Sequence, residues 1–183
     1  MSIISIGLLL LVSLLILLLI AGLFSRNSYT IEQSVIIEQP LEKVFNYIKF
    51  LKNQDYYHKW VMLDPAMKRE FKGQDGTNGF IYGWDSQNKA GAGEQEIKEI
   101  IDGKRIDMEV RFRKPFKGVA YSFMETGPVT TQLNNNHATN VKWVFSSQLK
   151  YPFNIMLLFM NIDKTLGRDL KTSLTNLKTI LEK

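Results

Sequence analysis

Cysteine is absent from the chain, and histidine is almost as scarce. Without cysteine there is no disulfide bond, no thiolate metal site and no cysteine nucleophile. The two histidines, His58 and His137, lack the spacing and the flanking carboxylates that a zinc site needs, so we expect no metal and no cofactor. We expect His137 to lie in a solvated, asparagine-rich turn. His58 is either a surface or capping residue or a group at the mouth of a cavity.

Charge is missing from the first 25 residues, and residues 3–24 form an almost unbroken apolar run. A helix of that length spans roughly 30 Å, about the thickness of a bilayer's hydrocarbon. We predict that residues 1–25 are an uncleaved transmembrane anchor and residues 26–28 a linker. A cleaved signal peptide is the alternative. The long run, the lack of a preceding Lys or Arg, and the lack of a small-x-small site at residues 21–25 favour the anchor.

All charged residues lie from Arg26 onward, so the net charge of +5 belongs to that part alone. Because Arg26 follows the apolar run and no basic side chain precedes it, positive-inside counting favours a cytoplasmic domain on a single-pass membrane protein. The basic excess is either ordinary solubility charge or an attraction to anionic lipid. Nucleic-acid binding would need a denser basic stripe, so we expect none.

Most of the remaining chain consists of short alternating segments between turn residues. Residues 105–113 are the clearest case, because apolar and charged residues alternate strictly, which predicts an antiparallel strand with one buried face. Asp102-Gly103 just before it predicts a tight hairpin. Comparable segments predict strands at residues 29–39, 67–72, 80–85, 93–101, 119–125 and 141–149, and a bend at Gly127-Pro128 before a short strand at 129–133.

Two regions have the apolar period of a helix. One starts at Pro40 and is followed by a short helix or turn over residues 53–60. The other covers residues 154–181, with an apolar stripe along its length. Such a one-sided helix must lie on an apolar surface, and the concave face of the sheet is the one available. The predicted fold class is α+β, with a curved antiparallel sheet wrapped around a long C-terminal helix in one domain over residues 29–183.

A series of motifs follows one another in a characteristic order. They are Pro40-Leu-Glu-Lys-Val-Phe45, Trp60 with Asp64-Pro65, Gly79-Phe-Ile-Tyr-Gly-Trp84, Gly91-Ala-Gly-Glu94, residues 106–112 with Pro115-Phe116, and Leu166-Gly-Arg-Asp-Leu170. In this order, the domain resembles the polyketide cyclase/dehydrase branch of the SRPBCC (START-like) superfamily. The resemblance implies a helix-grip fold. It implies little about chemistry, because that superfamily mixes lipid carriers, hormone receptors and cyclases.

A curved sheet that grips a helix often leaves a space between them, lined by inward aromatic and aliphatic side chains as ligand cavities usually are. We therefore predict a site for a hydrophobic or lipid-like small molecule there. The candidate ligand-binding residues are Phe80, Tyr82, Trp84, Met108, Val110, Phe112, Tyr121, Phe123, Trp143, Phe159, Leu166 and Leu170.

Catalysis would need an inward acid or base, and Glu94 and Glu96 are the candidates, since they share one face of a strand. Gln95, Ile97 and Ile101 share the opposite face, which favours an outward orientation for the two glutamates. Three hypotheses remain. The first is a membrane-anchored binding module without catalysis, the second a polyketide cyclase/dehydrase-like enzyme that uses a cavity carboxylate, and the third a structural or partner-binding domain with a filled core.

Overall fold

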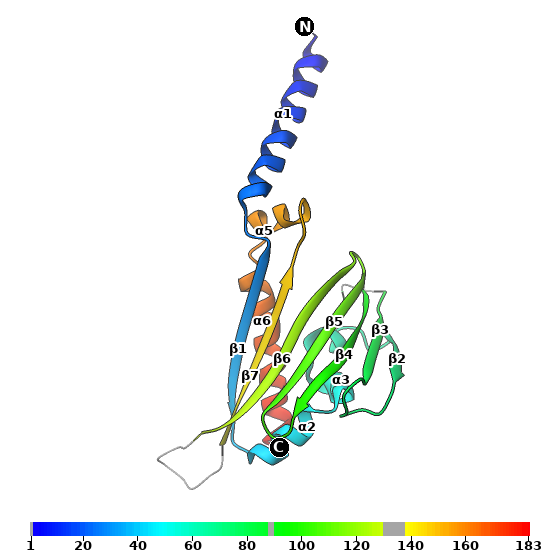
Figure 1. Ribbon diagram of the computed structural model, residues 1–183, viewed down its shortest axis with the longest axis vertical. Helices are drawn as coiled ribbons and strands as arrows, with labels where there is room; N and C mark the ends of the chain where they lie inside the picture. Colours follow the sequence, from blue (N-terminus) through cyan, green and yellow to red (C-terminus); the bar gives the residue numbers. More distant parts are fainter. Residues whose placement is uncertain (1, 88–89, 130–137) are drawn as a thin grey trace.

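The computed structural model describes residues 2–87, 90–129 and 138–183. The described part contains one antiparallel sheet of seven strands in the order β1-β7-β6-β5-β4-β3-β2. The sheet curves around a long C-terminal helix (Figure 1), which confirms the predicted α+β fold class. The strands are β1 Ser28–Ile37, β2 Lys68–Lys72, β3 Ile81–Asp85, β4 Ala92–Ile101, β5 Arg105–Lys114, β6 Gly118–Val129 and β7 Ala138–Gln148.

Between β1 and β2 the chain forms several short helices. α2 (Leu41–Ile48) buries Val44 and Phe45, and the 3-10 turn η1 (Leu51–Asn53) follows it. α3 (Gln54–Tyr57) and α4 (Lys59–Met62) then pack against the long helix α6 (Ile162–Leu181). These helices therefore close one side of the space between α6 and the sheet.

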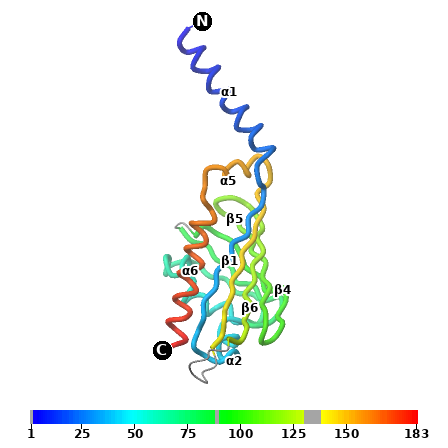
Figure 2. Tube along the Cα trace, turned by 90° about the vertical axis from the view of Figure 1, so that its left-hand side faces the viewer, coloured from blue at the N-terminus to red at the C-terminus, as the bar shows by residue number. Residues whose placement is uncertain are grey.

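The long helix lies on one face of the sheet, as Figure 2 shows. Leu170, Leu174, Leu177 and Leu181 form its buried stripe. Burying one such side chain contributes about 1.5–3 kcal/mol relative to leaving it in water, so this stripe is a main source of the contact between helix and sheet.

The predicted single helix over residues 154–181 is instead two helices. η2 (Phe153–Ile155) and α5 (Met156–Phe159) end at Met160, whose backbone is extended with φ −98° and ψ 121°. Asn161 then caps α6, because its side chain accepts a hydrogen bond from the main-chain N–H of Lys164, 3.0 Å away. The apolar period continues across this break, and so periodicity alone did not reveal it.

A bulge in β4 changes which isoleucine faces the core. The register with β5 shifts between Ile97 and Glu99, so that Ile100 rather than Ile101 packs against the core. Ile101 is 42% exposed, contrary to its predicted place on the inner face. An extra residue at a bulge reverses the alternation beyond it, which explains the error.

β6 also differs from its prediction. It runs through Gly127-Pro128 to Val129, and Pro128 pairs with Thr139 without a shift in register. The bend predicted at Gly127-Pro128 therefore does not interrupt the strand. The further strand predicted at residues 129–133 lies, after Val129, outside the described residues. The asparagine-rich turn with His137 lies outside them as well.

α1 (Ile3–Phe24) extends away from the sheet at one end of the molecule (Figure 1). It is exposed along almost its whole length, and Gly22 is its one buried residue. Within the described part of the chain, α1 is the one helix that is long and apolar enough to cross a bilayer. Its end is held by Asn154, whose Nδ2 donates to the main-chain oxygen of Gly22 at 2.7 Å and to Ser25 Oγ at 2.9 Å.

Candidate functional site: a pocket between the sheet and the long helix

A partly open pocket lies between the concave face of the sheet, the short helices α3 and α4, and the N-terminal half of α6. Its volume is about 70 Å³. The lining is mainly apolar and aromatic, and it includes all three tryptophans of the chain, Trp60, Trp84 and Trp143. A concave, apolar pocket with few polar groups is typical of small-molecule sites.

Most of the sequence candidates lie at this pocket or next to it. Those that line it are Tyr82, Trp84, Val110, Phe112, Trp143, Leu166 and Leu170. Phe80 and Met108 are buried in the adjoining core and do not line the pocket.

Three candidates point away from the pocket, which corrects the prediction. Tyr121 and Phe123 lie on the outer face of β6: Tyr121 is 60% exposed, and the Arg105 guanidinium lies 3.6 Å from the centre of the Phe123 ring. Their neighbours Ala120, Ser122 and Met124 are the buried residues of this strand. Phe159 lies on α5, outside the gripped helix, and is 72% exposed.

The inner face of β6 carries a small polar residue, Ser122, where the indole of Trp143 lies against the strand. Ser122 Oγ accepts a hydrogen bond from Trp143 Nε1 at 2.8 Å and donates one to the main-chain oxygen of Val144 at 3.0 Å. A larger side chain at position 122 would displace the indole. The hydroxyl of Ser122 is therefore a positioning group for the pocket wall, and it has no bonding capacity to spare as a donor.

Gln54, which the sequence analysis did not identify, places an amide at the pocket. Its side chain is 3% exposed, and its Nε2 has no hydrogen-bond partner among the described residues. A buried donor without a partner costs about 1–3 kcal/mol, so native proteins rarely keep one without a reason. The sequence signal was the spacing of three residues that puts Gln54 on the same helical face as Leu51 and Tyr57. All three side chains are buried in the structure.

His58 caps the helix α4 and also lines the pocket. Its Nδ1 accepts the main-chain N–H of Trp60 at 3.2 Å, and its ring meets the Trp143 ring edge-on at 5.3 Å between centroids. Burial lowers its pKa to about 4, against an opposing effect of Asp169, so the ring is neutral at pH 7. Because Nδ1 accepts, the proton lies on Nε2, which donates to none of the described residues.

Asp169 is the one carboxylate among the described residues that line the pocket. It forms a short ion pair with Lys59, and its Oδ2 accepts a hydrogen bond from Trp60 Nε1 at 2.9 Å. The carboxylate is thus occupied in fixing α4 to α6. No group of three or more His, Asp or Glu side chains in the described part of the chain is arranged to hold a metal ion.

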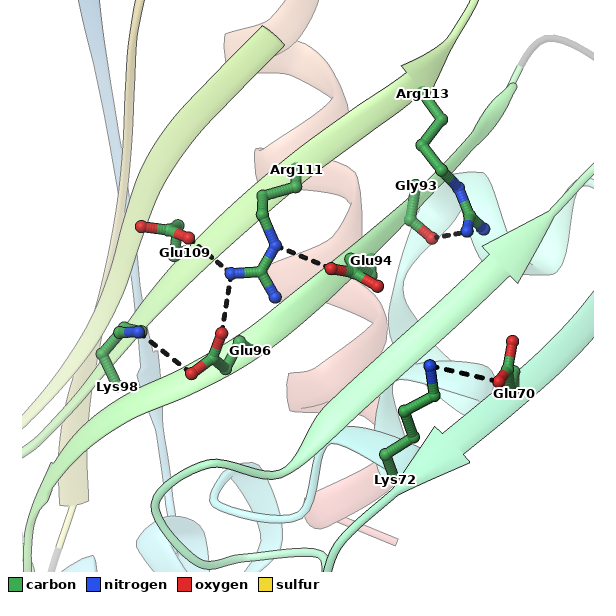
Figure 3. Close-up of polar contacts among 9 residues, drawn as sticks. All are labelled: Glu70, Lys72, Gly93, Glu94, Glu96, Lys98, Glu109, Arg111 and Arg113. Carbon is green, nitrogen blue, oxygen red and sulfur yellow. Dashed lines mark hydrogen bonds and ion pairs between the residues drawn. The ribbon is translucent and has the colours of Figure 1, made fainter. Parts of the chain in front are cut away.

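Glu94 and Glu96 lie on the outer face of the sheet, as Figure 3 shows. Arg111 on the neighbouring strand bonds both of them at 2.7 Å, and it also bonds Glu109 at 2.5 Å. Hydrogen bonds from Lys98 and Arg111 hold the pKa of Glu96 below its usual value. Because Gln95, between the two glutamates, is the residue that faces the pocket, neither carboxylate reaches a molecule held there.

Comparison with known proteins identifies the fold. No protein-family model and no curated protein sequence matches the chain.

Several solved structures share its architecture. Protein CV1439 from Chromobacterium violaceum is 12% identical with a TM-score of 0.58, and the match covers 84% of this chain and 97% of that one. A truncated norcoclaurine synthase from Thalictrum flavum is 11% identical with a TM-score of 0.59, covering 86% and 95%. The protein TTHA0849 from Thermus thermophilus is 16% identical with a TM-score of 0.57, covering 84% and 97%.

These matches place the chain in the helix-grip (START-like) fold class. At such low identity they establish the fold and leave the polyketide cyclase/dehydrase resemblance at the level of a prediction. Another structure of norcoclaurine synthase, 13% identical to this chain with a TM-score of 0.56 and coverages of 89% and 92%, is a complex with dopamine and hydroxybenzaldehyde.

Proposed function

We propose that the chain is a membrane-anchored binding module for an uncharged, mainly apolar small molecule that carries a hydrogen-bond acceptor. The observation that carries this proposal is the pair of donors at the pocket, Gln54 Nε2 and His58 Nε2, which donate to none of the described residues. A ligand carbonyl, ether or hydroxyl oxygen would supply the missing acceptor. The aromatic walls would contact the rest of the molecule.

The charges at the pocket support an uncharged ligand. His58 is neutral at pH 7 because of its low pKa, and Asp169 is already paired with Lys59. No unpaired cation among the described lining residues offers a counter-ion to an anionic ligand. Taking a charged molecule into such a site would cost several kcal/mol without compensation.

The volume of the pocket limits the size of the ligand. At about 70 Å³ it is roughly half of the 150 Å³ cavity that accommodates a benzene ring in another protein. A molecule larger than one ring would have to extend through the open side of the pocket. The presence of dopamine and hydroxybenzaldehyde in norcoclaurine synthase, which shares the fold, is consistent with single-ring molecules.

The apolar helix supports the membrane part of the proposal. α1 has 22 residues without a charge and is exposed along its length. Between its two ends its main-chain groups are hydrogen-bonded within the helix, as hydrocarbon requires, and at the ends Ser2 Oγ accepts the N–H of Ser5 and Asn154 donates to the oxygen of Gly22. A helix of this kind in water would leave a large apolar surface unpaired, whereas a bilayer would cover it. Counting of basic residues favours the cytoplasmic side for the domain.

Binding can be tested on the full chain in detergent micelles with three matched probes, which are acetophenone, ethylbenzene and benzoate. Acetophenone has the acceptor, ethylbenzene lacks it, and benzoate carries a charge. We expect calorimetric titration to rank acetophenone first, with a change in tryptophan emission because all three tryptophans line the pocket. Native mass spectrometry of the chain from its own host would then identify any ligand that remains bound.

A near-isosteric Gln54→Met variant serves to locate the binding. It should reduce the preference for acetophenone over ethylbenzene by roughly tenfold, the equivalent of about 1.4 kcal/mol for one lost hydrogen bond. Glu94→Gln on the outer face is the matched control and should bind like the wild type. Equal, micelle-like uptake of all three probes, with no bound molecule from the host, would refute the binding module.

A further inference from the structure

A second apolar surface adjoins the C-terminal end of α1. It consists of Phe116 at the β5–β6 turn and of residues in and around η2 and α5, and we call it the apolar collar. Phe159, Phe116 and Phe153 are 72%, 61% and 57% exposed. Exposed aromatic side chains in one cluster are unusual on a soluble surface and mark a site of contact with another apolar phase. The collar consists of Phe116, Tyr151, Phe153, Leu158, Phe159 and Met160.

The collar is one surface although its residues come from two parts of the chain. The rings of Phe116 and Phe153 lie 6.2 Å apart between centroids. Both α5 and the β5–β6 turn lie at the end of the sheet from which α1 emerges (Figure 1). A single flat apolar phase at this end would therefore reach both segments.

Contacts with α1 define the height of the collar along that helix. A Cβ placed at Gly22 would lie 2.6 Å from Ile155 and 3.4 Å from Tyr151, so these side chains touch the last turn of α1 directly. Twenty-two residues give a helix of about 33 Å, close to the hydrocarbon thickness of roughly 30 Å. If α1 spans a bilayer, the collar therefore lies at the boundary between acyl chains and headgroups.

The charges around the collar fit a lipid surface. Lys117 and Lys150 flank it, are exposed, and form no ion pair with the described residues. Aromatic side chains together with lysines are the usual composition of a protein at a membrane interface, where lysine stems lie on acyl chains and the ammonium groups meet phosphate. Contact with an apolar protein partner would leave the charges of Lys117 and Lys150 without a counter-ion, whereas lipid phosphates would provide one.

We propose that the apolar collar inserts into the headgroup–acyl boundary of the membrane that α1 crosses, an inference that rests on the proposed anchor. Phe112 lies on β5, four residues before Phe116 of the β5–β6 turn, and Leu166 lies in α6, six residues after Met160; Phe112 and Leu166 both line the pocket. Short stretches of the same two chain segments thus link the pocket wall to the collar.

The lack of cysteine allows single labels to be introduced at chosen positions of the full chain. Phe116→Cys and Phe159→Cys would carry an environment-sensitive fluorophore, in vesicles of phosphatidylcholine and phosphatidylglycerol with nitroxide-labelled acyl chains. Leu14→Cys in the middle of α1 is the positive control, and Ile101→Cys at the opposite end of the sheet is the negative one. All four side chains are already exposed, so labelling leaves the core intact.

We expect a blue shift and strong quenching at positions 116 and 159, approaching those at position 14, and no quenching at position 101. If position 14 is quenched and positions 116 and 159 behave like 101, the anchor holds and the collar assignment is overturned. If position 14 is not quenched either, α1 does not cross the bilayer, and the membrane part of the proposed function fails together with the collar. The probe titrations of the pocket are independent of both results.

Discussion

The side-chain amide of Asn154 donates a hydrogen bond to the main-chain oxygen of Gly22, 2.7 Å away, and so joins the segment before α5 to the end of α1. The same amide reaches Ser25 Oγ at 2.9 Å, while the Asn154 Oδ1 atom is buried without a partner among the described residues. One small polar residue, 3% exposed, therefore determines how the apolar helix meets the domain.

Substitutions at Asn154 should distinguish the contribution of its hydrogen bonds from that of its packing. Asn154→Ala removes two hydrogen bonds and should lower the free energy of unfolding by about 1–3 kcal/mol. Asn154→Asp should cost more at pH 7, because a buried carboxylate would then face the oxygen of Gly22. Thermal unfolding of the full chain in micelles measures both. An aspartate variant as stable as the wild type would show that the donor is not needed.

The low pKa of His58 predicts a loss of stability in acid. Its folded pKa is about 4 against 6.5 unfolded, so below pH 6.5 the unfolded chain binds a proton that the folded chain does not. Stability contributed by this group is present above pH 6.5 and falls as the pH is lowered toward 4, by about 3 kcal/mol in total.

The His58→Asn variant provides the comparison, because asparagine retains a side-chain acceptor for the cap of α4 but does not titrate. Unfolding by urea between pH 7 and pH 4 should show a drop in wild-type stability that exceeds the drop in the variant by about 3 kcal/mol. Parallel pH profiles would mean that His58 is not held neutral by burial.

The unpaired amide of Gln54 should be a cost to the empty protein. Gln54→Met removes the buried donor at similar volume, so we expect the ligand-free chain to gain about 1 kcal/mol or more. The same variant should bind acetophenone more weakly, so the substitution should raise stability and lower binding at the same time. Melting temperatures with and without the probe test this, with exposed Gln148→Met as the control. A less stable empty variant would contradict the assignment of Nε2 as unpaired.

Two glycines should respond oppositely to alanine. At Gly167 on α6, a Cβ would lie 3.4 Å from Gln33 Nε2, which is an ordinary contact, so Gly167→Ala should gain up to about 1 kcal/mol of helix propensity. At Gly93 a Cβ would lie 2.6 Å from both the main-chain oxygen of Arg111 and the Trp84 ring, so Gly93→Ala should destabilise the chain. Thermal unfolding of the two variants should give shifts of opposite sign.

Arg111 holds three carboxylates together on the outer face, and Arg111→Gln should leave Glu94, Glu96 and Glu109 to repel one another. Because the pKa of Glu96 is lowered, its contribution to wild-type stability is present above its usual value of 4.5 and is lost as the pH falls through the folded pKa. The wild type should therefore exceed the variant most at neutral pH, with the gap closing in acid.

Arg113→Gln is the matched control for this measurement, since Arg113 is exposed and its contact with the main-chain oxygen of Gly93 is long, at 3.4 Å. Ligand binding should be unaffected in both variants. A constant gap between wild type and Arg111→Gln at all pH values would argue that the guanidinium acts through packing and not through charge.

Strand positions followed from the sequence where one face is apolar and the other charged. β5 is the example, because a one-residue slip would turn its charged residues into the core. The bulge after Ile97 has no comparable signal, since Ile100 and Ile101 are equally apolar. The inner face of β6 was predicted wrongly for a different reason. Its larger aromatic residues, Tyr121 and Phe123, face outward because Trp143 fills the space inside.

The break between α5 and α6 had a local signal, an asparagine followed by Asp163 in the next turn. The stronger apolar period concealed it. The walls of the pocket were largely predictable because they are aromatic residues on alternating strands. Its polar residues were not, since whether Gln54 and His58 lack partners depends on side chains brought together from distant parts of the chain.

Only Ser25, Arg26 and Asn27 separate α1 from β1, and these residues are themselves held. Arg26 pairs with Asp163 at 3.2 Å, and the main-chain oxygen of Asn27 accepts the N–H of Leu149 at 2.7 Å. Even fully extended, three residues reach only about 10 Å. With α1 in a bilayer, this domain would be no shuttle between compartments. It would act as a tethered binding site that diffuses only within the plane of one membrane and delivers its molecules at that membrane.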